Sequence, residues 1–284
     1  MEKASEKEKE ALEKYLIQFL NIEKLFPLLP GVVNTDAVAG LMGLETDELT
    51  KLRQLFADNA KQAAMELLKE EEVIEWIDQI PISPDSTVVA LGDSATDDLQ
   101  GWFEIFKYVL EITVPEADFT FVNAGISNNT TTDALRRMNR DVLSHNPDWV
   151  IVSLSAFDTI RLSYAPGRTL IPLSETWENL ATIQDAIETV TENPPVWITP
   201  PPVIPELLEK MELFEFSIEN RDLAAVREIL IGKKGYIVDP LGKRMGNPPE
   251  AWFYLSDGIN PSLSGHVNTV KELLRSLATA KVKE

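Results

Sequence analysis

An aspartate–serine pair stands where a buried apolar run ends. Residues 87–91 read TVVAL, and Gly92, Asp93 and Ser94 follow before a polar, helical pattern begins. A serine at a strand-to-helix turn has the place of a nucleophile, because a helix N-terminus favours the negative charge that develops at an attacked carbonyl. The alternative interpretation is that Asp93, Ser94 and Thr96 only cap the next helix.

Three further polar blocks follow apolar runs. Asn123–Gly125 leads into ISNNTTTD, Ser155–Asp158 reads SAFD, and Ser256–His266 reads SDGINPSLSGH ahead of the last helical pattern. In a parallel sheet the ligand crevice lies beyond the carboxyl ends of the strands. We therefore expect these blocks and Ser94 to meet at one edge of a sheet.

The elements that would position them alternate along the second part of the chain. Five short apolar strands are predicted at Thr87–Leu91, Phe119–Asn123, Trp149–Leu154, Val196–Ile198 and Tyr236–Val238. Helical patterns lie near 98–113, 131–145, 175–192, 206–230 and 263–281. Continuously apolar strands that alternate with helices predict a parallel sheet covered on both faces.

Residues 1–80 form a different region, which reads as entirely helical. Thr46 is a plausible N-cap, and an apolar stripe follows at helical spacing: Leu49, Leu52, Phe56, Ala60, Ala63 and Leu67. Such a stripe needs a surface to cover, so we expect an extension (1–82) packed on a main domain (83–284). The prolines of PISPDS, residues 81–86, mark the boundary.

The four blocks together resemble the SGNH/GDSL hydrolase family, in that family's usual order. The segments GDSATDDLQGWFEI, NPDWVIV, TLIPLSETWENL, WITPPPV and DGINPSLSG carry the resemblance, which runs through the whole chain, the helical N-terminal extension included. It implies a three-layer α/β/α sandwich with a parallel five-stranded, flavodoxin-like sheet. It also implies a serine ester hydrolase that acts on a small-molecule ester and needs no metal or cofactor.

Carried over residue by residue, the resemblance assigns Ser94 as nucleophile and first oxyanion donor, Gly125 as second donor and Asp257 as the acid that orients a base. Two positions depart from the family pattern. Phe157 stands where the family has the oxyanion asparagine, and Asn260 stands where it has the catalytic histidine. An asparagine has no proton-accepting nitrogen near neutral pH, so the usual mechanism should be almost silent.

Four interpretations therefore stay open. The chain is a weak esterase with an altered proton path; or a pseudoenzyme that binds an acyl or carbohydrate ligand or a protein partner; or a deliberately inactivated variant. The fourth treats the acidic helical extension as an interaction or dimerisation module, so the chain is a possible homo-oligomer. The fourth is compatible with each of the others.

Other side chains have competing interpretations. Asp93, Asn128 and Arg161 are candidates for substrate binding, with helix capping or surface ion pairing as the alternatives. Of the two histidines, His145 is expected at a helix C-terminus and His266 at the surface or as a cap, although His266 is also a candidate substitute base. The remaining candidates have structural interpretations: Asp97 and Asp98 at a helix start rather than on a metal, Arg168 in a salt bridge, and Trp102, Trp177 and Trp252 in the core.

Composition limits the partners. The 284 residues include 26 basic and 46 acidic ones, giving a net charge of −20, which repels nucleic acids and anionic membranes. There are no cysteines, which excludes disulfides and thiol catalysis and suits a cytoplasmic location. No apolar run is long enough to cross a bilayer.

Overall fold

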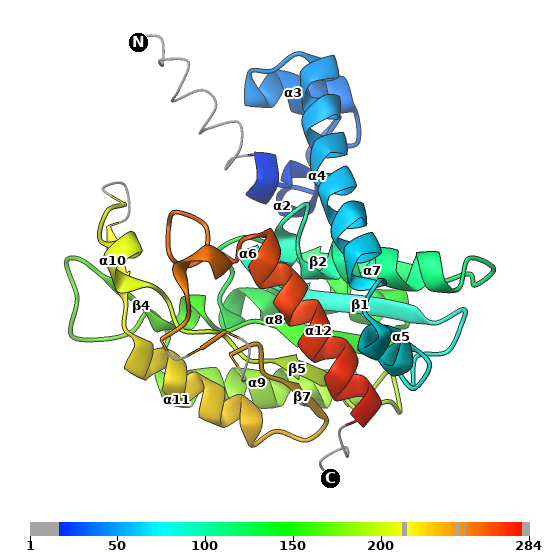
Figure 1. Ribbon diagram of the computed structural model, residues 1–284. Coiled ribbons are helices and arrows are strands. Elements are labelled where there is room, and N and C mark those ends of the chain that lie inside the picture. Colours follow the sequence, from blue (N-terminus) through cyan, green and yellow to red (C-terminus); the bar gives the residue numbers. More distant parts are fainter. Residues whose placement is uncertain (1–16, 212–214, 242–244, 247, 280–284) are drawn as a thin grey trace.

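A five-stranded parallel sheet is the centre of the molecule (Figure 1). The computed structural model describes residues 17–211, 215–241, 245–246 and 248–279. In spatial order the strands are β2 (Thr120–Gly125), β1 (Thr87–Gly92), β3 (Trp149–Ser153), β5 (Val196–Ile198) and β7 (Tyr236–Val238). The five predicted strands are thus confirmed, and their order is flavodoxin-like.

Helices cover both faces of this sheet. Val88 and Ala90 belong to the core on one side, whereas Val89 and Leu91 belong to the core on the other, as alternation along a strand requires. The first face carries α7 (Trp102–Thr113), α12 (Leu263–Thr279) and the end of the N-terminal extension; the second carries α8 (Thr131–Asp141), α9 (Leu173–Glu188) and α11 (Asn220–Ile231). The predicted three-layer sandwich is therefore confirmed.

The single helix predicted at 206–230 is wrong. The segment instead contains α10 (Pro205–Leu208), strand β6 (Phe216–Ile218) and α11. β6 pairs antiparallel with β4 (Ile160–Leu162), a strand that was also not predicted. Apolar Phe216 and Ile218 flank polar Ser217, and this short alternation suits a strand. Three 3₁₀ turns complete the described elements: Leu143–His145, Phe157–Thr159 and Ala251–Phe253.

The N-terminal extension contains four described helices: α2 (Ile22–Leu25), α3 (Thr35–Met42), α4 (Thr46–Leu67) and α5 (Glu71–Ile77). The expectation of an entirely helical region is wrong for residues 26–34, which are turns and loop, and residues 1–16 lie outside the described ones. Gly43 closes α3 with a φ of 72°, a conformation that glycine adopts without strain. The prediction of Thr46 as an N-cap is wrong by one residue, because α4 begins at Thr46 and Glu45 is its N-cap.

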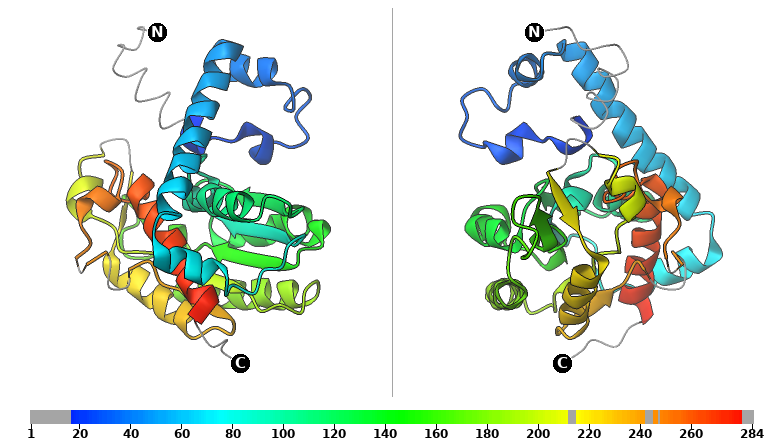
Figure 2. Two further views of the ribbon diagram at one scale, coloured as in Figure 1. Left: turned by 45° about the vertical axis from the view of Figure 1, so that its right-hand side comes forward. Right: turned by 90° about the vertical axis from the view of Figure 1, so that its left-hand side faces the viewer.

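The predicted apolar stripe of α4 divides between two cores. Ala60, Ala63 and Leu67 join the main core, which α7 and α12 also line. Leu49 and Phe56 pack in a smaller cluster with apolar residues of the extension itself: Ile17, Ile22, Val32, Val38 and Ala39. Consequently one half of α4 lies on the main domain and the other half rises from it with α3 (Figure 2).

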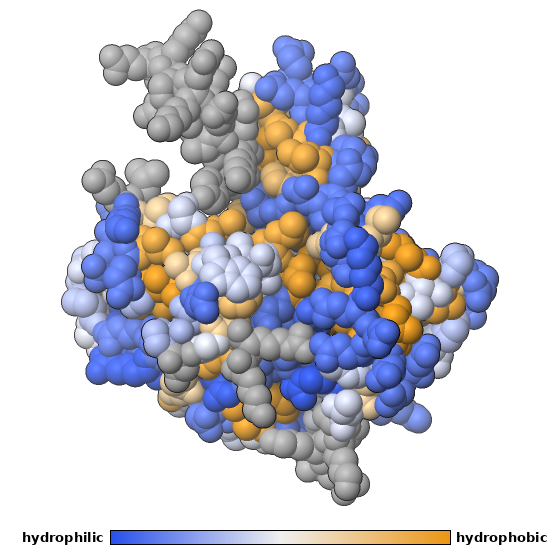
Figure 3. Space-filling model, viewed as in Figure 1, coloured by the Kyte–Doolittle hydropathy of each residue, from blue (hydrophilic) through white to orange (hydrophobic). Residues whose placement is uncertain are grey.

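The rising part of the extension leaves large apolar side chains exposed, and apolar surface gathers beside α3 and α4 in Figure 3. Leu28 is 94% exposed and Val33 is 91% exposed. A second copy of the chain would pack on this surface if the extension mediates self-association. Among the described residues, no helix combines the length and the apolar character needed to cross a membrane.

Candidate active site

Ser94 lies at the sharp turn between β1 and α6 (Ser94–Asp97). Asp93 caps this short helix by accepting from the backbone N–H of Ala95 at 3.2 Å. A side chain at Gly92 would approach Thr96 Oγ1 to 2.0 Å, so only glycine allows the turn. Ser94 is buried, and its Oγ accepts a hydrogen bond from the backbone N–H of Asn128 at 3.0 Å.

That hydrogen bond changes the assignment of the second oxyanion donor. The N–H of Gly125 donates to Asn123 Oδ1 at 3.0 Å, so it is already engaged within β2. Gly125 is a close-packing position instead, because an added Cβ would come within 2.5 Å of the Asp97 backbone nitrogen. The N–H that faces Ser94 belongs to Asn128, whose φ of +61° is a left-handed conformation that favours glycine or asparagine.

Asp257 holds Asn260 as a catalytic acid would hold a histidine. Its Oδ1 accepts from the backbone N–H groups of Ile259 and Asn260, and its Oδ2 accepts from Asn260 Nδ2 at 2.8 Å. The loop therefore keeps the acid and the orientation of residue 260. Asn260 offers an amide at this place, which cannot accept a proton near neutral pH.

The block after β3 has an apolar side chain, Phe157, at the position where the family resemblance expects a hydrogen-bond donor to an oxyanion. Phe157 is buried in a cluster formed with Ile160, Val203, Leu208, Ile218 and Leu223. Two residues earlier, Ser155 is fully buried with a φ of 99°, and its hydroxyl has no hydrogen-bond partner among the described residues. Neither side chain supplies a hydrogen bond to the Ser94 region.

A small cavity of about 60 Å³ opens beside Ser94 at the carboxyl ends of the strands. Asp93 and Ala95, the two neighbours of Ser94, line it together with Phe157 and Asn260. The rest of its wall is mainly apolar: Leu154, Ile198, Pro200, Pro201, Val203, Ile218, Leu223, Ile259 and Pro261. This size and lining suit a short acyl group.

Two buried carboxyl groups next to the cavity have perturbed acidity. Burial is the main cause that raises the pKa of Asp93 to about 7, and the negative charge of Asp158 adds to it. Burial also raises the pKa of Asp158, although Thr131 and Thr176 donate hydrogen bonds to its carboxylate.

Buried Arg137 holds the backbone around this region. It donates to the carbonyl oxygens of Gly92 and Ala124 at 3.0 and 2.6 Å, and so ties β1 to β2 beneath the serine. Sequence reasoning did not select Arg137. A basic residue on a helix between two strand-end blocks is too common for its position in the sequence to indicate a buried structural role.

Asp93 gives a testable pH dependence. Its folded pKa of about 7 lies above its usual value of 3.8, so the native state binds this proton more tightly than the unfolded state does. The resulting stabilisation is complete below about pH 4 and is lost as the pH rises through 7. We expect Asp93→Asn, which mimics the protonated acid, to gain on the order of 2–4 kcal/mol relative to wild type between pH 5 and pH 8. Urea unfolding of both proteins at the two pH values measures this difference, and an unchanged difference would contradict the shifted pKa.

The N-terminal extension reaches the loops around Ser94 through polar contacts that the sequence did not reveal. Asp97 Oδ1 accepts from Lys24 Nζ at 2.8 Å and from Asn21 Nδ2, while its Oδ2 accepts from the Ser127 N–H at 2.9 Å. Asp98 Oδ2 lies 2.7 Å from Gln18 Nε2 and 3.0 Å from His266 Nε2. Within the described ranges, no three acidic or histidine side chains are placed to share a metal ion.

Several predicted positions need correction. His266 enters α12 as expected but is completely buried against Asp98, rather than at the surface. Arg161 does not line the cavity beside Ser94; it lies in a separate pocket and donates to Asp222 at 2.7 Å. Trp177 and Trp252 are each 55% exposed, so core packing is wrong for both, whereas Trp102 is buried.

His145 and Arg168 also lie away from the cavity beside Ser94. His145 is exposed at the end of a 3₁₀ turn. Arg168 contributes to the same separate pocket as Arg161, and its guanidinium approaches the carbonyl oxygens of Thr169 and Leu170 instead of a carboxylate. Neither residue contacts the cavity beside Ser94.

The family model of the GDSL-like Lipase/Acylhydrolase family matches residues 90–267, more than half of the chain. This match covers the turn at Ser94, the Asn128 loop and the Asp257–Asn260 pair. The chain therefore belongs to the GDSL-like lipase/acylhydrolase (SGNH) family, a family of carboxylic ester hydrolases.

Solved structures share the fold. A lipase/acylhydrolase from Enterococcus faecalis is 21% identical with a TM-score of 0.53, and the match covers 70% of this chain and 97% of that one. An alpha/beta hydrolase from the metagenome of Lake Arreo, Spain, is 19% identical with a TM-score of 0.55, covering 69% and 96%.

The acetylxylan esterase Axe2 from Geobacillus stearothermophilus is 21% identical with a TM-score of 0.52, covering 70% and 96%. Two further matched structures are catalytic mutants of that esterase, one with a serine and one with a histidine replaced by alanine. A comparison with curated proteins gives no match. At these identities the likeness to the solved structures concerns the fold.

Proposed function

We propose that the chain is a slow carboxylic ester hydrolase for short acyl groups, with Ser94 as its nucleophile. The observation that carries this proposal is the contact between Ser94 Oγ and the Asn128 N–H, at a helix N-terminus beside a small cavity. The N–H groups of Ser94 and Asn128 are the two backbone donors available for an oxyanion. The neighbouring cavity takes the acyl chain.

The reaction divides into two steps. Ser94 Oγ bonds to the ester carbonyl carbon, and the alcohol departs with the proton that the serine loses; water then attacks the acyl-serine and releases the acid. Asn260 keeps the contact with Asp257 but cannot carry the proton between serine and leaving group. Phe157 withholds a third oxyanion donor. Both replacements make the expected rate low.

A second candidate function follows from the same two residues. If Asn260 and Phe157 abolish turnover, the cavity is a binding site for an acyl or carbohydrate ligand or for a segment of a partner protein. Its apolar wall favours an acyl group among these. The catalytic mutants of the acetylxylan esterase concern a serine and a histidine, whereas the strand-end blocks of this chain place Ser94 and Asn260 beside the cavity.

Hydrolysis of p-nitrophenyl acetate by the wild-type chain and by Ser94→Ala tests the choice. We expect slow, saturable turnover by the wild type and only the uncatalysed rate with Ser94→Ala. Ser144→Ala, which removes an exposed hydroxyl far along the chain, is the matched control and should behave as wild type. Equal rates for wild type and Ser94→Ala would reject the hydrolase and favour the binding site.

A further inference from the structure

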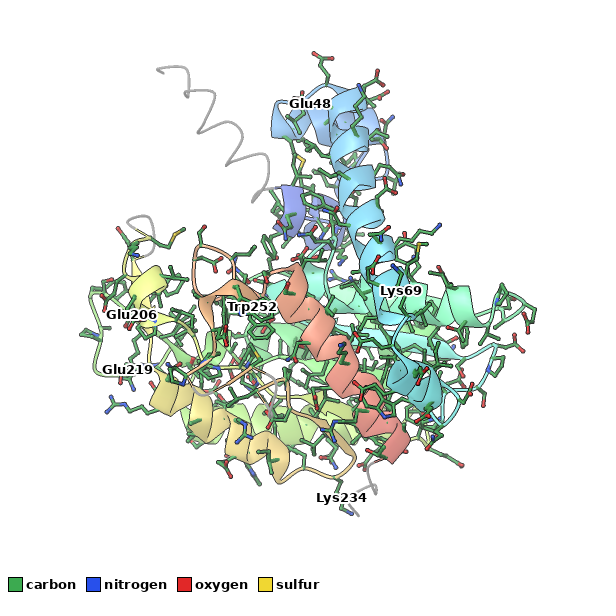
Figure 4. The ribbon with its side chains drawn as sticks, in the orientation of Figure 1. Glu48, Lys69, Glu206, Glu219, Lys234 and Trp252 are labelled. Atoms are coloured by element: carbon green, nitrogen blue, oxygen red, sulfur yellow. The ribbon has the colours of Figure 1, made fainter. Side chains whose placement is uncertain are left out.

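A second hollow lies on the opposite edge of the sheet, between α9 and α11. Its volume is about 540 Å³, and Trp177, Gln184, Glu228, Lys233 and Lys234 are its larger lining side chains. Lys233 and Lys234 precede β7, whereas Ser94 follows β1. Because the strands are parallel, the two sites lie at opposite strand ends. Figure 4 labels Lys234 beyond the end of α11. We call this hollow the α9–α11 groove.

Lys233 is a buried cation in this groove. Its side chain is only 9% exposed, and its Nζ lies 5.7 Å from the ring centre of Trp197 and 6.0 Å from that of Trp177. Among the described residues no carboxylate comes within 4.0 Å of this nitrogen; Asp185 attracts it only from farther away. Burial lowers the pKa of Lys233. The two indole rings offset part of the cost of desolvating this ammonium, and a bound anion would offset more of it.

The two tryptophans on either side of Lys233 differ in a way that points to a ligand. Trp197 is fully buried in β5 and donates from Nε1 to the carbonyl oxygen of Lys234, so it forms a fixed floor. Trp177 is 55% exposed at the groove, so an indole face is accessible. Exposed indoles stack well on rings with an apolar face. Gln184 donates from Nε2 to Glu188 at 2.9 Å and Glu228 pairs through Oε1 with Arg227 at 3.3 Å, so Gln184 Oε1 and Glu228 Oε2 are the atoms that can accept from ligand hydroxyls.

We propose that the α9–α11 groove binds an acidic sugar unit, a ring that carries a carboxylate. The carboxylate pairs with the Lys233 ammonium, the apolar face of the ring stacks on Trp177, and the hydroxyls bond to Gln184 and Glu228. The net charge of −20 repels anions from the surface as a whole, so an anion that binds this chain needs a local cation such as Lys233. Because the groove is separate from Ser94, this binding does not depend on ester hydrolysis.

Titration of the full chain with sodium glucuronate, followed by tryptophan fluorescence at constant ionic strength, tests the proposal. We expect saturable binding, weakened at least tenfold by Lys233→Met and by Trp177→Ala. The matched controls are Lys61→Met, which removes an exposed lysine, and Trp252→Ala, which removes an equally exposed tryptophan outside the groove. Both controls should bind as wild type does, and so should Ser94→Ala. Glucose, which lacks the carboxylate, should not saturate the groove.

Two results of the glucuronate titration would contradict the proposal. Absence of saturable glucuronate binding, or unchanged affinity in Trp177→Ala, would overturn the proposal. Because Trp177 is exposed, we expect this variant to keep the fold even if Lys233→Met does not. Sodium benzoate tests whether the groove takes an aromatic acid instead of an acidic sugar, because both carry a carboxylate on a ring. Saturation by benzoate without saturation by glucuronate would show that the groove takes aromatic acids, and would reject the acidic sugar.

Discussion

Replacing Asn260 by histidine is expected to raise the rate of p-nitrophenyl acetate hydrolysis by about three orders of magnitude. In serine hydrolases, loss of the histidine base lowers kcat by roughly a millionfold, whereas the oxyanion donors alone retain about a thousandfold over water. In the proposed site, this chain keeps the serine, the orienting aspartate and two backbone donors. The base is the largest single contribution that residue 260 can restore.

The geometry around Asp257 is the reason to expect that a histidine would be oriented correctly. Asp257 Oδ2 already accepts a hydrogen bond from Asn260 Nδ2 at 2.8 Å, and its Oδ1 fixes the backbone of residues 259 and 260. In Asn260→His, Nδ1–H takes over the bond to Oδ2. The second ring nitrogen is then expected to extend into the cavity that Asn260 lines together with Asp93 and Ala95, the two neighbours of Ser94.

Two variants make this result specific. Asn260→Gln introduces a longer side chain without a basic nitrogen and should leave the rate unchanged. Asn260→His combined with Ser94→Ala should lose the gain, because the base has no nucleophile to activate. A histidine variant that is no faster than wild type would mean that residue 260 does not face Ser94 as the Asp257 contacts indicate.

Phe157→Asn should add about a tenfold or larger gain to Asn260→His by supplying a third oxyanion donor. The same change removes a buried ring from the cluster with Val203 and Ile218, so we expect a loss of about 3 kcal/mol in stability. Phe157→Leu is its control, since it removes the ring without adding a donor. The rate must therefore be compared at a temperature at which all variants are folded.

The strand ends of the sheet were predictable because their signals are local. Continuous apolar runs such as Trp149–Ser153 and the glycine–aspartate–serine turn need only neighbouring residues to be recognised. The antiparallel pair β4 and β6 was not predictable in this way. Its strands are three residues long, and even the closest register pair, Leu162 with Phe216, is 54 positions apart in the sequence, so each strand's partner is known only from the fold.

The identity of the oxyanion donor shows a finer limit. The sequence predicts Gly125, at the end of β2, as the second oxyanion donor, since glycine is the usual residue where a backbone N–H must approach a ligand. Three residues later, Asn128 adopts the left-handed conformation that brings its N–H to Ser94. Asparagine tolerates this conformation better than most residues do, but it also caps helices, so its type alone does not decide between the two roles.

The contacts of the N-terminal extension with Asp97 could not be predicted, because they join residues more than 70 positions apart. Asp97 is 1% exposed and connects three segments: the nucleophile helix α6, the loop of Ser127 and Asn128, and the extension at Asn21 and Lys24. The Ser127 hydroxyl also donates to Asp97 Oδ2 at 2.9 Å, and a carboxylate with four such donors is strongly held. Asp97 is therefore a positioning residue for the N–H that faces Ser94.

Asp97→Asn should lower the free energy of unfolding by about 2–4 kcal/mol. One acceptor oxygen is replaced by an NH2 group that faces other hydrogen-bond donors, and Lys24 loses its buried negative partner. The substitution should also lower kcat at least tenfold in the Asn260→His background, since Asn128 follows directly on Ser127. The KM for the ester should change much less, because Asp97 does not line the cavity. Urea unfolding and steady-state kinetics measure the two effects on the same preparations.

Asp118→Asn is the matched control, because Asp118 is exposed and its carboxylate accepts no hydrogen bond within the described part of the chain. A fall in stability without any fall in kcat would make Asp97 a structural residue only. A fall in kcat alone, with KM and the urea midpoint unchanged, would show that the extension contributes to the reaction chiefly by holding the Asn128 loop. The combined loss is the result we expect, since the same four hydrogen bonds hold the extension and place the oxyanion donor.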